Sequence, residues 1–322
     1  KTLLTTISLD NVAMMPCNPA VGGPGKSHLV KELDALGGEM GIAADATAIQ
    51  MRMPNSSKGP AVYALRAQSD KGAYHRYMKK VIENTDNLDL KQMMVVDILE
   101  EDGHVNGIIS ELGEAYTAKA VILCTGTYLE SDIIIGDNKY KGGPNGMRPS
   151  TGLSENLRKH GIELLRFKTG TPSRVDLRTL HLDHMALEEG DPKHHSFSFM
   201  DEDVDRNKAV CWLTYTNETT HKIIRDNIKR APKYSGLITG VGARYCPSIE
   251  DKVVKFPDKT RHQVFIEPEG LYTNEMYLGG MSSSLPEDVQ YAMYRTVPGL
   301  EHVRIVRNAL TRPVCQTFHI NS

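Results

Sequence analysis

Cys17 lies in a loop that could activate its thiol. The segment Met15-Pro-Cys-Asn-Pro19 leads through several glycines to Ser27, where a helix is expected to begin. A helix N-terminus stabilises negative charge, so a nearby cysteine is favoured as the reactive thiolate. The alternative is that Cys17 is a small buried apolar residue, because free cysteines are often packed in cores. Position alone therefore makes Cys17 a candidate catalytic residue.

Cys246 is the second candidate catalytic thiol. It lies between Gly240 and Lys252, where Arg244 and Lys252 favour a thiolate while Glu250 and Asp251 oppose it. The flanking glycines and Pro247 indicate a shaped loop, and functional residues concentrate in loops. Cys124 differs because it ends an apolar run and is predicted to be a core residue.

The glycine-rich segment after Cys17 resembles a phosphate-binding P-loop only superficially. Ala20-x-x-x-x-Gly25-Lys26-Ser27 lacks the first glycine, and Met93–Asp97 imitates the acidic strand of such sites. A P-loop must follow directly on a buried strand, but two prolines interrupt Met14–Pro19. What remains is a glycine-rich loop at a helix N-terminus, which suits an anion or an electron-rich cofactor ring.

A histidine-rich segment provides a weak metal candidate. His181-x-x-His184 precedes His194-His195, with Asp183 and Asp191 close by. The spacing matches no known ligand set, and the segment is polar. We therefore expect a solvated loop and no metal site.

Two basic stretches could contact phosphates. Lys58 to Lys80 has six Lys and Arg residues against Asp70, and a second set runs from Lys222 to Lys233. Such charge usually marks the solvated face of a helix. With Tyr63, Tyr74 and Tyr77 able to stack on bases, it could also follow a nucleic-acid backbone.

The elements that must position these residues follow from hydrophobic periodicity. Prolines and glycines predict a loop from Asn11 to Lys26. Ser27 is predicted to cap a helix that ends at Gly37-Gly38. Five strands are expected at 3–7, 93–99, 105–110, 116–117 and 120–124, the last of them buried in a mostly parallel sheet. Helices are expected at 60–84, 152–160 and 218–230, and short strands at 197–199 and 211–215.

Composition limits the class of protein. The 322 residues predict about two domains, with the boundary near residue 170. The net charge of −2 argues against a uniformly basic nucleic-acid coat, and no apolar run reaches the roughly 18 residues of a membrane span. No signal peptide is visible, and five widely spaced cysteines fit reduced thiols, so we expect a cytoplasmic protein. Because Lys1 replaces an initiator methionine, we expect a fragment.

Several motifs, taken together, resemble the MnmG/GidA family of flavoproteins that modify the wobble uridine of tRNA. They occur in one order from Leu3 to about Arg307. The matching segments are Met15–Gly38, Asn55–Val62, Leu65–Asp70, Leu123–Thr127, Lys168–Pro172, Arg244–Asp251, His262–Gly270 and Ser283–Pro286.

The resemblance implies an α/β fold with an FAD-binding Rossmann-like domain of the glutathione-reductase type and an inserted α+β domain linked to NAD. In this chain it implies a partial FAD-binding domain at 1–170, incomplete at its N-terminus, an inserted domain at 171–307 and a divergent tail at 308–322. It also implies a homodimer, tRNA as the substrate and an MnmE-type GTPase as a partner. Reduced FAD, NADH and methylenetetrahydrofolate would supply the carboxymethylaminomethyl or aminomethyl group at C5 of uridine.

The resemblance also implies site residues. The two family cysteines correspond to Cys17 and Cys246, and we expect Cys246 to be the nucleophile and Cys17 the flavin-proximal acid or base, although the roles could be reversed. Cofactor contacts would fall on Asn18, Gly22, Gly23, Gly25, Lys26, Val95, Thr125, Gly126, Thr127, Ser150, Gly242, Arg244 and Tyr245. Independently, positive charge makes Lys58, Arg66, Lys222, Arg225 and Lys229 candidate RNA contacts.

The chain departs from the family pattern in ways that keep other functions open. It has no G-x-G-x-x-G motif, so the first Rossmann strand would precede Lys1, and Leu3–Thr6 would be the second strand. After Arg307 the sequence Asn-Ala-Leu-Thr-Arg-Pro replaces a Tyr-Ala-Ile-Glu-Tyr-Asp type segment. The alternatives are a truncated, inactive tRNA-binding remnant, or a flavin reductase of similar fold.

Overall fold

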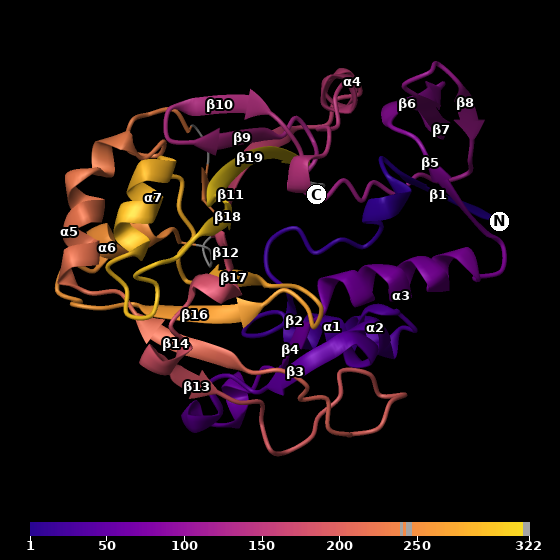
Figure 1. Ribbon diagram of the computed structural model, residues 1–322. Helices are drawn as coiled ribbons and strands as arrows, with labels where there is room; N and C mark the ends of the chain where they lie inside the picture. The colour runs from indigo at the N-terminus through magenta and orange to yellow at the C-terminus, as the bar shows by residue number, and fades with distance from the viewer. Residues whose placement is uncertain (239–240, 243–246, 318–322) are drawn as a thin grey trace.

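Five β-sheets and seven α-helices make up the described part of the chain, which covers residues 1–238, 241–242 and 247–317 of the computed structural model (Figure 1). The mixed α/β composition agrees with the predicted fold class. No helix within these ranges combines the length and the apolar character that a bilayer crossing requires.

The largest sheet has six strands in the order β13-β14-β16-β17-β12-β18. Three helices, α5, α6 and α7, pack beside it, on the left of Figure 1. Apolar side chains of these helices and of β16 and β17 form one buried cluster that includes Ile224, Val253, Ile266 and Tyr294. The bounds are β12 Arg174–Asp176, β13 Ala186–Glu188, β14 Cys211–Tyr215, β16 Gln263–Pro268, β17 Glu275–Gly279, β18 Ile305–Arg307, α5 Glu218–Asp226, α6 Ile249–Lys255 and α7 Glu287–Tyr294.

A five-stranded sheet, β10-β9-β19-β11-β15, joins the end of the described chain to its middle. Its bounds are β9 Asp132–Ile135, β10 Asn138–Lys141, β11 Leu164–Thr171, β15 Val241–Gly242 and β19 Leu310–Thr317. β11 and β19 pair antiparallel from Leu164↔Thr317 to Thr171↔Leu310. The tail from Asn308, expected to be divergent, therefore supplies the strand β19. The predicted boundary at residue 170 falls within β11 and stays a prediction.

The N-terminal third forms a smaller unit around the antiparallel sheet β2-β4-β3. Three helices accompany these strands, and β1 pairs in parallel with β5 in a separate two-stranded sheet. The bounds are β1 Thr2–Thr6, β2 Ala20–Gly22, β3 Ala48–Arg52, β4 Arg66–Ser69, β5 Leu88–Gln92, α1 Ser27–Ala35, α2 Met40–Thr47 and α3 Lys71–Glu83.

Three predictions in this unit are wrong. The helix expected from Pro60 to Asn84 is instead a 3₁₀ turn, the strand β4 and helix α3, which Asp70 caps by accepting a hydrogen bond from the Ala73 amide at 2.8 Å. Pairing of β4 with β2 and β3 overrides helical periodicity there. The same pairing makes a strand of 20–22 within the expected loop. Ser27 begins α1 but does not cap it, because the N-cap position is Lys26. The helix ends at Ala35 with Leu36 as its C-cap, just before the predicted Gly37-Gly38.

The predicted β-meander is confirmed. β6 Val95–Glu101, β7 His104–Ser110 and β8 Ala115–Thr117 pair in order, with the turn at Asp102-Gly103. Helix α4 Leu153–Lys159 packs beside it and matches the predicted helix.

Two predicted strands are absent from the described residues. Ala120–Cys124 forms no strand, and Ile122 and Cys124 are exposed, so Cys124 is not a core residue. An apolar run becomes a strand only beside another strand, and the sheet of β1 and β5 does not extend to this segment. Phe197–Phe199 forms a turn whose amides bind carboxylates instead of a neighbouring strand.

Candidate functional site

The loop that carries Cys17 is attached to the turn between β11 and β12. Cys17 is half-buried, and its Sγ lies 3.7 Å from the carbonyl oxygen of Gly170. The guanidinium of Arg174 donates a hydrogen bond to the carbonyl oxygen of Cys17 itself. Residues more than 150 positions apart in the sequence thereby set the position of the thiol.

Arg174 belongs to a buried network of charges. Its Nε donates to Glu269 Oε1 at 2.9 Å, and a second nitrogen donates to Thr171 Oγ1 at 2.6 Å. Glu269 also pairs with Lys71 Nζ at 2.5 Å, and burial lowers the pKa of Lys71 despite that carboxylate. Arg174, Glu269 and Lys71 thus each have an oppositely charged partner within this network, as stability requires.

The glycines after Cys17 shape a turn that leads into α1. Gly23 accepts a hydrogen bond from the Ser27 amide at 3.1 Å and donates one to Leu65 at 2.8 Å. Gly22, Gly23 and Gly25 have φ of 82°, 88° and 74°, a region that favours glycine. A side chain at Gly22 would collide with Phe197, whereas Gly25 borders open space. Lys26 is exposed and Asn18 half-buried at the edges of this turn.

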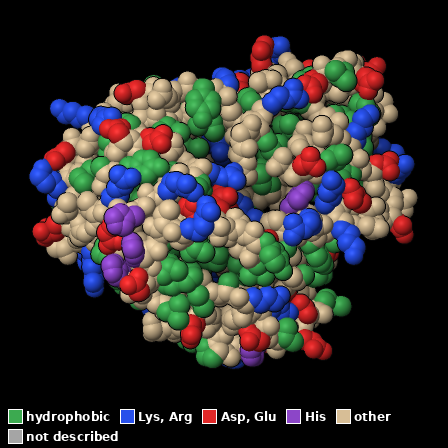
Figure 2. All heavy atoms as spheres, in the orientation of Figure 1, with side chains coloured by type: hydrophobic (Ala, Val, Ile, Leu, Met, Phe, Trp, Pro, Cys, Tyr) green, Lys and Arg blue, Asp and Glu red, His purple; other side chains and the backbone are tan. Residues whose placement is uncertain are grey.

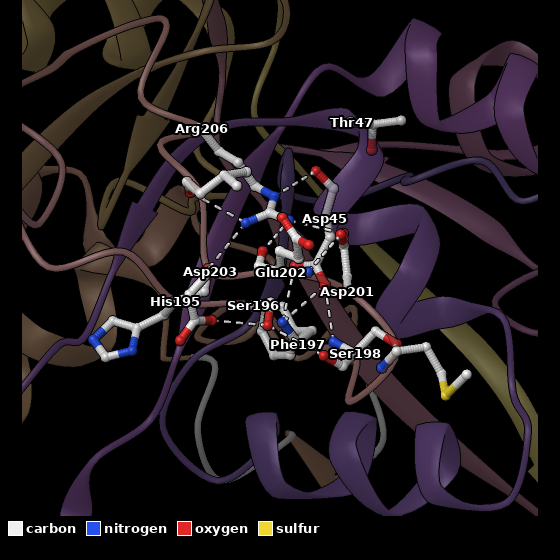
Figure 3. A network of polar contacts seen from close by, with 12 residues as sticks. Asp45, Thr47, His195, Ser196, Phe197, Ser198, Asp201, Glu202, Asp203 and Arg206 are labelled. Carbon is white, nitrogen blue, oxygen red and sulfur yellow. Dashed lines mark hydrogen bonds and ion pairs between the residues drawn. The ribbon is translucent and has the colours of Figure 1, made fainter.

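A polar network holds Phe197 under Gly22 (Figure 3). The carboxylate of Asp45 on α2 accepts hydrogen bonds from the amides of Phe197 at 2.9 Å and Ser198 at 2.8 Å. Burial raises the pKa of Asp45, although these two amides oppose the shift. Arg206 donates to the Asp45 carbonyl at 3.1 Å and pairs with Asp201 at 2.8 Å, which closes the loop around the network. The support for the glycine turn therefore comes from a distant segment.

A cavity of about 340 Å³ opens beside the Cys17 loop. Its wall includes Pro16, the β9–β10 hairpin, Arg174 and Arg312 of β19. Arg312 is buried and lies with one guanidinium nitrogen 3.5 Å from Thr127 Oγ1. The structure thus brings Thr127 of the segment Thr125-Gly126-Thr127 and Cys17 close to one arginine.

Val95 and Ser150 lie at a different place, beside a small apolar core. Val95 begins β6 and packs against the cluster that contains Leu129 and Leu153. Ser150 is buried and forms a parallel bridge with Leu129. Leu129 therefore links the two residues, because it belongs to the cluster that Val95 contacts and pairs with Ser150. This arrangement is compatible with one binding surface for the two predicted FAD contacts.

The second candidate thiol lies outside the described residues, as do Arg244 and Tyr245. Gly242 is described and pairs in parallel with Lys168 of β11. Gly170 of the same strand contacts Cys17, so β15 pairs with the strand that contacts the Cys17 loop. Lys168 is buried 3.8 Å from Asp251, a residue of α6.

Asp251 forms the other charged centre of this region. Burial raises its pKa, but Lys233 and Lys168 outweigh that effect and the net shift is downward. Tyr234 donates to the same carboxylate at 3.1 Å, and its own pKa is raised to about 12 by burial and by Asp251. Asp251 is therefore held ionised beside β11.

The candidate RNA contacts divide into two groups. Lys58, Lys222, Arg225 and Lys229 are exposed, the last three along α5 and the turn after it. Figure 2 shows basic side chains interspersed with acidic ones over this part of the surface, and Lys222 pairs with Asp226 at 2.6 Å. Arg66 instead turns inward, where it pairs at 2.8 Å with Glu267. Burial raises the pKa of Glu267, and Arg66 opposes that shift.

The histidine-rich segment forms a surface cluster. His181 and His184 stack at 5.6 Å between ring centroids, and His302 lies edge-on to His181. Within the described ranges, no three His, Cys, Asp or Glu side chains form a group able to hold a metal ion.

Sequence reasoning missed three residues of the Cys17 site. Arg174 and Glu269 lie at or beside the matched segments 168–172 and 262–270, so those motifs were available signals. Nothing in the sequence marked Arg312, since only the pairing of β19 with β11 brings it beside the loop.

Comparison with known proteins relates nearly the whole chain to one family. A family model described as "Glucose inhibited division protein A" matches residues 1–312. The chain is 60% identical over 310 residues to the "tRNA uridine 5-carboxymethylaminomethyl modification enzyme MnmG" of Lachnoclostridium phytofermentans, and 59% identical over 309 residues to that of Caldicellulosiruptor saccharolyticus. Each alignment covers 96% of this chain and 49% of the relative, so the chain spans about half the length of these relatives.

The structural comparison agrees. The solved structure of Aquifex aeolicus GidA in its form I crystal matches with a TM-score of 0.92 and 49% identity, over 98% of this chain and 54% of the other. The form II crystal matches with a TM-score of 0.90 and 46% identity, over 98% and 51% of the two chains. The predicted family and fold class are therefore confirmed.

Proposed function

The chain belongs to the glucose inhibited division protein A family, and on this premise we propose that it takes part in FAD-dependent modification of the tRNA wobble uridine. The reaction would place a carboxymethylaminomethyl or aminomethyl group on C5 of the base. The single observation that carries the proposal is 60% identity over 96% of this chain to a relative named as that tRNA uridine modification enzyme.

The residues after Cys17 suit the flavin end of FAD. Gly23 and Gly25 have positive φ, and Gly25 faces open space at the start of α1, so a flat ring could approach this backbone closely. Asn18, Lys26 and Thr125–Thr127 would complete the contacts, with Val95 and Ser150 on the separate apolar core. The sequence holds no G-x-G-x-x-G motif for the pyrophosphate, so these residues fit only part of the cofactor. When bound, FAD supplies hydride chemistry, which no side chain provides.

The thiols supply the nucleophile and the proton transfer. C5 of uracil is a poor nucleophile until a group adds to C6. In our proposal the Cys246 thiolate forms that bond, which places electron density on C5, and Cys17 exchanges the proton as acid or base. Arg174 donates a hydrogen bond to the Cys17 carbonyl oxygen, and Cys17 Sγ contacts Gly170. These contacts support a fixed position for the Cys17 thiol. The reverse assignment of roles uses the same geometry.

The remaining participants come from the resemblance. NADH would reduce FAD, methylenetetrahydrofolate would supply the one-carbon unit, and an MnmE-type GTPase would be the partner of a homodimer. Lys58, Lys222, Arg225 and Lys229 are exposed and available for tRNA phosphates. Arg66 pairs with Glu267, so we assign it a supporting role under Gly23.

The test measures modified nucleosides in tRNA. The purified chain is incubated with unmodified tRNA, FAD, NADH, methylenetetrahydrofolate, the GTPase partner with GTP, and glycine or ammonium, followed by nucleoside mass spectrometry. A modified wobble uridine, lost in both Cys17→Ser and Cys246→Ser, supports the proposal. If both variants still modify tRNA, the thiol roles are wrong.

A visible absorption titration with FAD accompanies this assay. Bound flavin without tRNA modification would favour a flavin reductase. Binding of tRNA with neither flavin nor modification would favour the non-catalytic remnant.

A further inference from the structure

Arg312 is a buried cation without a counterion in the described part of the chain. Arg312 is 6% exposed, and the one hydrogen bond of its side chain to another described residue runs from a terminal guanidinium nitrogen to Thr127 Oγ1 at 3.5 Å. Its Nε is buried and has no hydrogen-bond partner. No carboxylate pairs with it among the described residues.

Such an arrangement is unfavourable without a ligand. Burying a charge is costly unless the charge is paired and hydrogen-bonded. Burial lowers the pKa of Arg312, the neighbouring Cys17 and Tyr128 oppose that shift, and the second cation Arg174 adds to it. An anion beside the guanidinium would remove this cost.

The cavity beside Arg312 has the charge that an anion requires. Its lining includes Lys141, Arg174, Arg307 and Arg312 but contains no Asp or Glu. Three of these cations already have carboxylates behind them. Lys141 pairs with Asp132 at 3.0 Å, Arg174 with Glu269 at 2.9 Å and Arg307 with Glu275 at 2.7 Å. The uncompensated charge of the cavity is therefore that of Arg312.

We propose that this cavity binds an oxyanion of the phosphate class, with the Arg312 guanidinium as its principal donor. A guanidinium offers parallel N–H donors that match two oxygens of a phosphate. The volume of about 340 Å³ has room for more than a lone phosphate, so a phosphodiester is also accommodated. Pro16 forms part of the wall, which places the bound oxyanion next to the Cys17 loop. The site goes beyond the proposed function, whose residues assign no phosphate to this cavity.

The experiment measures binding in phosphate-free buffer without FAD, GTPase or folate. Melting temperature is recorded for the chain, for Arg312→Gln, for Arg312→Lys and for Arg295→Gln, whose arginine is exposed at the end of α7. Sodium phosphate is titrated at constant ionic strength, and a parallel titration uses the dinucleotide UpU. Phosphorus NMR line widths report binding independently of stability.

With added ligand, we expect the melting temperatures of the unchanged chain and of Arg295→Gln to rise to a plateau. We also expect both proteins to broaden the phosphorus NMR signal of the ligand. Arg312→Gln should lose both effects, and Arg312→Lys should keep a weaker response because it retains the charge without the fork. Without ligand, Arg312→Gln should melt at least about 2 °C higher than the chain, because the uncompensated charge is gone.

The two ligands identify the source of the oxyanion. A response to phosphate alone indicates a free phosphate group, and a response to UpU indicates a nucleic-acid phosphodiester. The proposal is overturned if Arg312→Gln responds to both ligands as the chain does, since the effect would then be general salt stabilisation. It is also overturned if neither ligand broadens or stabilises the chain. Neither result depends on tRNA modification, so failure here is separate from failure of the proposed function.

Discussion

Arg174 and Cys17 are joined through a hydrogen bond from a guanidinium to a backbone carbonyl oxygen, across 157 positions of sequence. The same guanidinium is paired with Glu269 inside the six-stranded sheet region. The position of a candidate catalytic loop thus depends on a charge network that belongs to another sheet.

Removing Arg174 should therefore destabilise the protein and displace the loop. In Arg174→Met, Glu269 keeps Lys71 as its single ionic partner among the described residues, and the loss of a buried charge partner costs about 3 kcal/mol of unfolding free energy. Urea denaturation measures this loss. The control Arg178→Met removes an exposed partner of Asp176, which keeps Arg304, and should cost less than about 1 kcal/mol. Equal losses in both variants would contradict the role given to Arg174.

Replacing Asp45 should loosen the segment beneath Gly22. In Asp45→Asn one acceptor oxygen is replaced by an NH₂ donor that faces backbone amides. We therefore expect the unfolding free energy to fall by about 2 kcal/mol and the Phe197 and Ser198 amides to exchange faster. Hydrogen exchange followed by mass spectrometry detects the local change. The matched variant Asp203→Asn alters an exposed carboxylate that accepts from Ser196 and should leave those amides protected. Unchanged exchange in Asp45→Asn would show that the network does not hold the loop.

Thiol labelling should separate the cysteines by burial. Cys124 is exposed and should react with iodoacetamide much faster than Cys211, which should remain unlabelled in the native protein. Burial raises the pKa of Cys211 to about 12, so both access and thiolate fraction protect it. Peptide mass spectrometry over time follows the labelling of each of the two cysteines, and Cys124→Ala should leave Cys211 unlabelled. Native labelling of Cys211 as fast as Cys124 would contradict the packing of β14.

Stability should fall as the pH drops below about 6.5, the ordinary pKa of histidine. Burial lowers the pKa values of His221 and His262, whose rings lie 5.1 Å apart. The unfolded chain then binds more protons than the native one, so acid favours unfolding by at most about 1.4 kcal/mol per pH unit for each histidine.

The double variant His221→Gln and His262→Gln isolates this effect. Its unfolding free energy should vary less between pH 5 and 6.5 than that of the chain, as measured in urea at each pH. The exposed His28→Gln should keep the original slope. An unaltered slope in the double variant would assign the acid sensitivity to other groups.

The exposed basic residues of α5 and of the turn after it give a test for RNA binding. Changing Lys222, Arg225 and Lys229 to Gln should weaken tRNA binding and reduce the dependence of log affinity on log salt, because fewer counterions are released. Fluorescence anisotropy at several salt concentrations measures both. Lys119→Gln, an exposed lysine away from α5, is the single-charge control. An unchanged salt slope in the triple variant would remove α5 from the RNA surface.

The sequence by itself determined the family, the loop character around Cys17, the meander and several helices. These features depend on local signals: prolines and glycines that exclude regular structure, alternation of apolar residues, and Asn217, which caps α5 with Thr220 as its capping-box partner. Such signals act within a few residues and can be interpreted without knowing the neighbours in space.

Only the tertiary structure decided the strands at Ala20–Gly22 and Arg66–Ser69, the unpaired state of 120–124 and the contacts of Arg174, Glu269 and Arg312. A strand exists only if another strand satisfies its backbone groups, and a buried charge is tolerated only if a partner reaches it. Both conditions depend on segments far apart in the sequence. The pairing of β11 with β19 is the decisive case, because it brings Arg312 next to a loop almost 300 residues away.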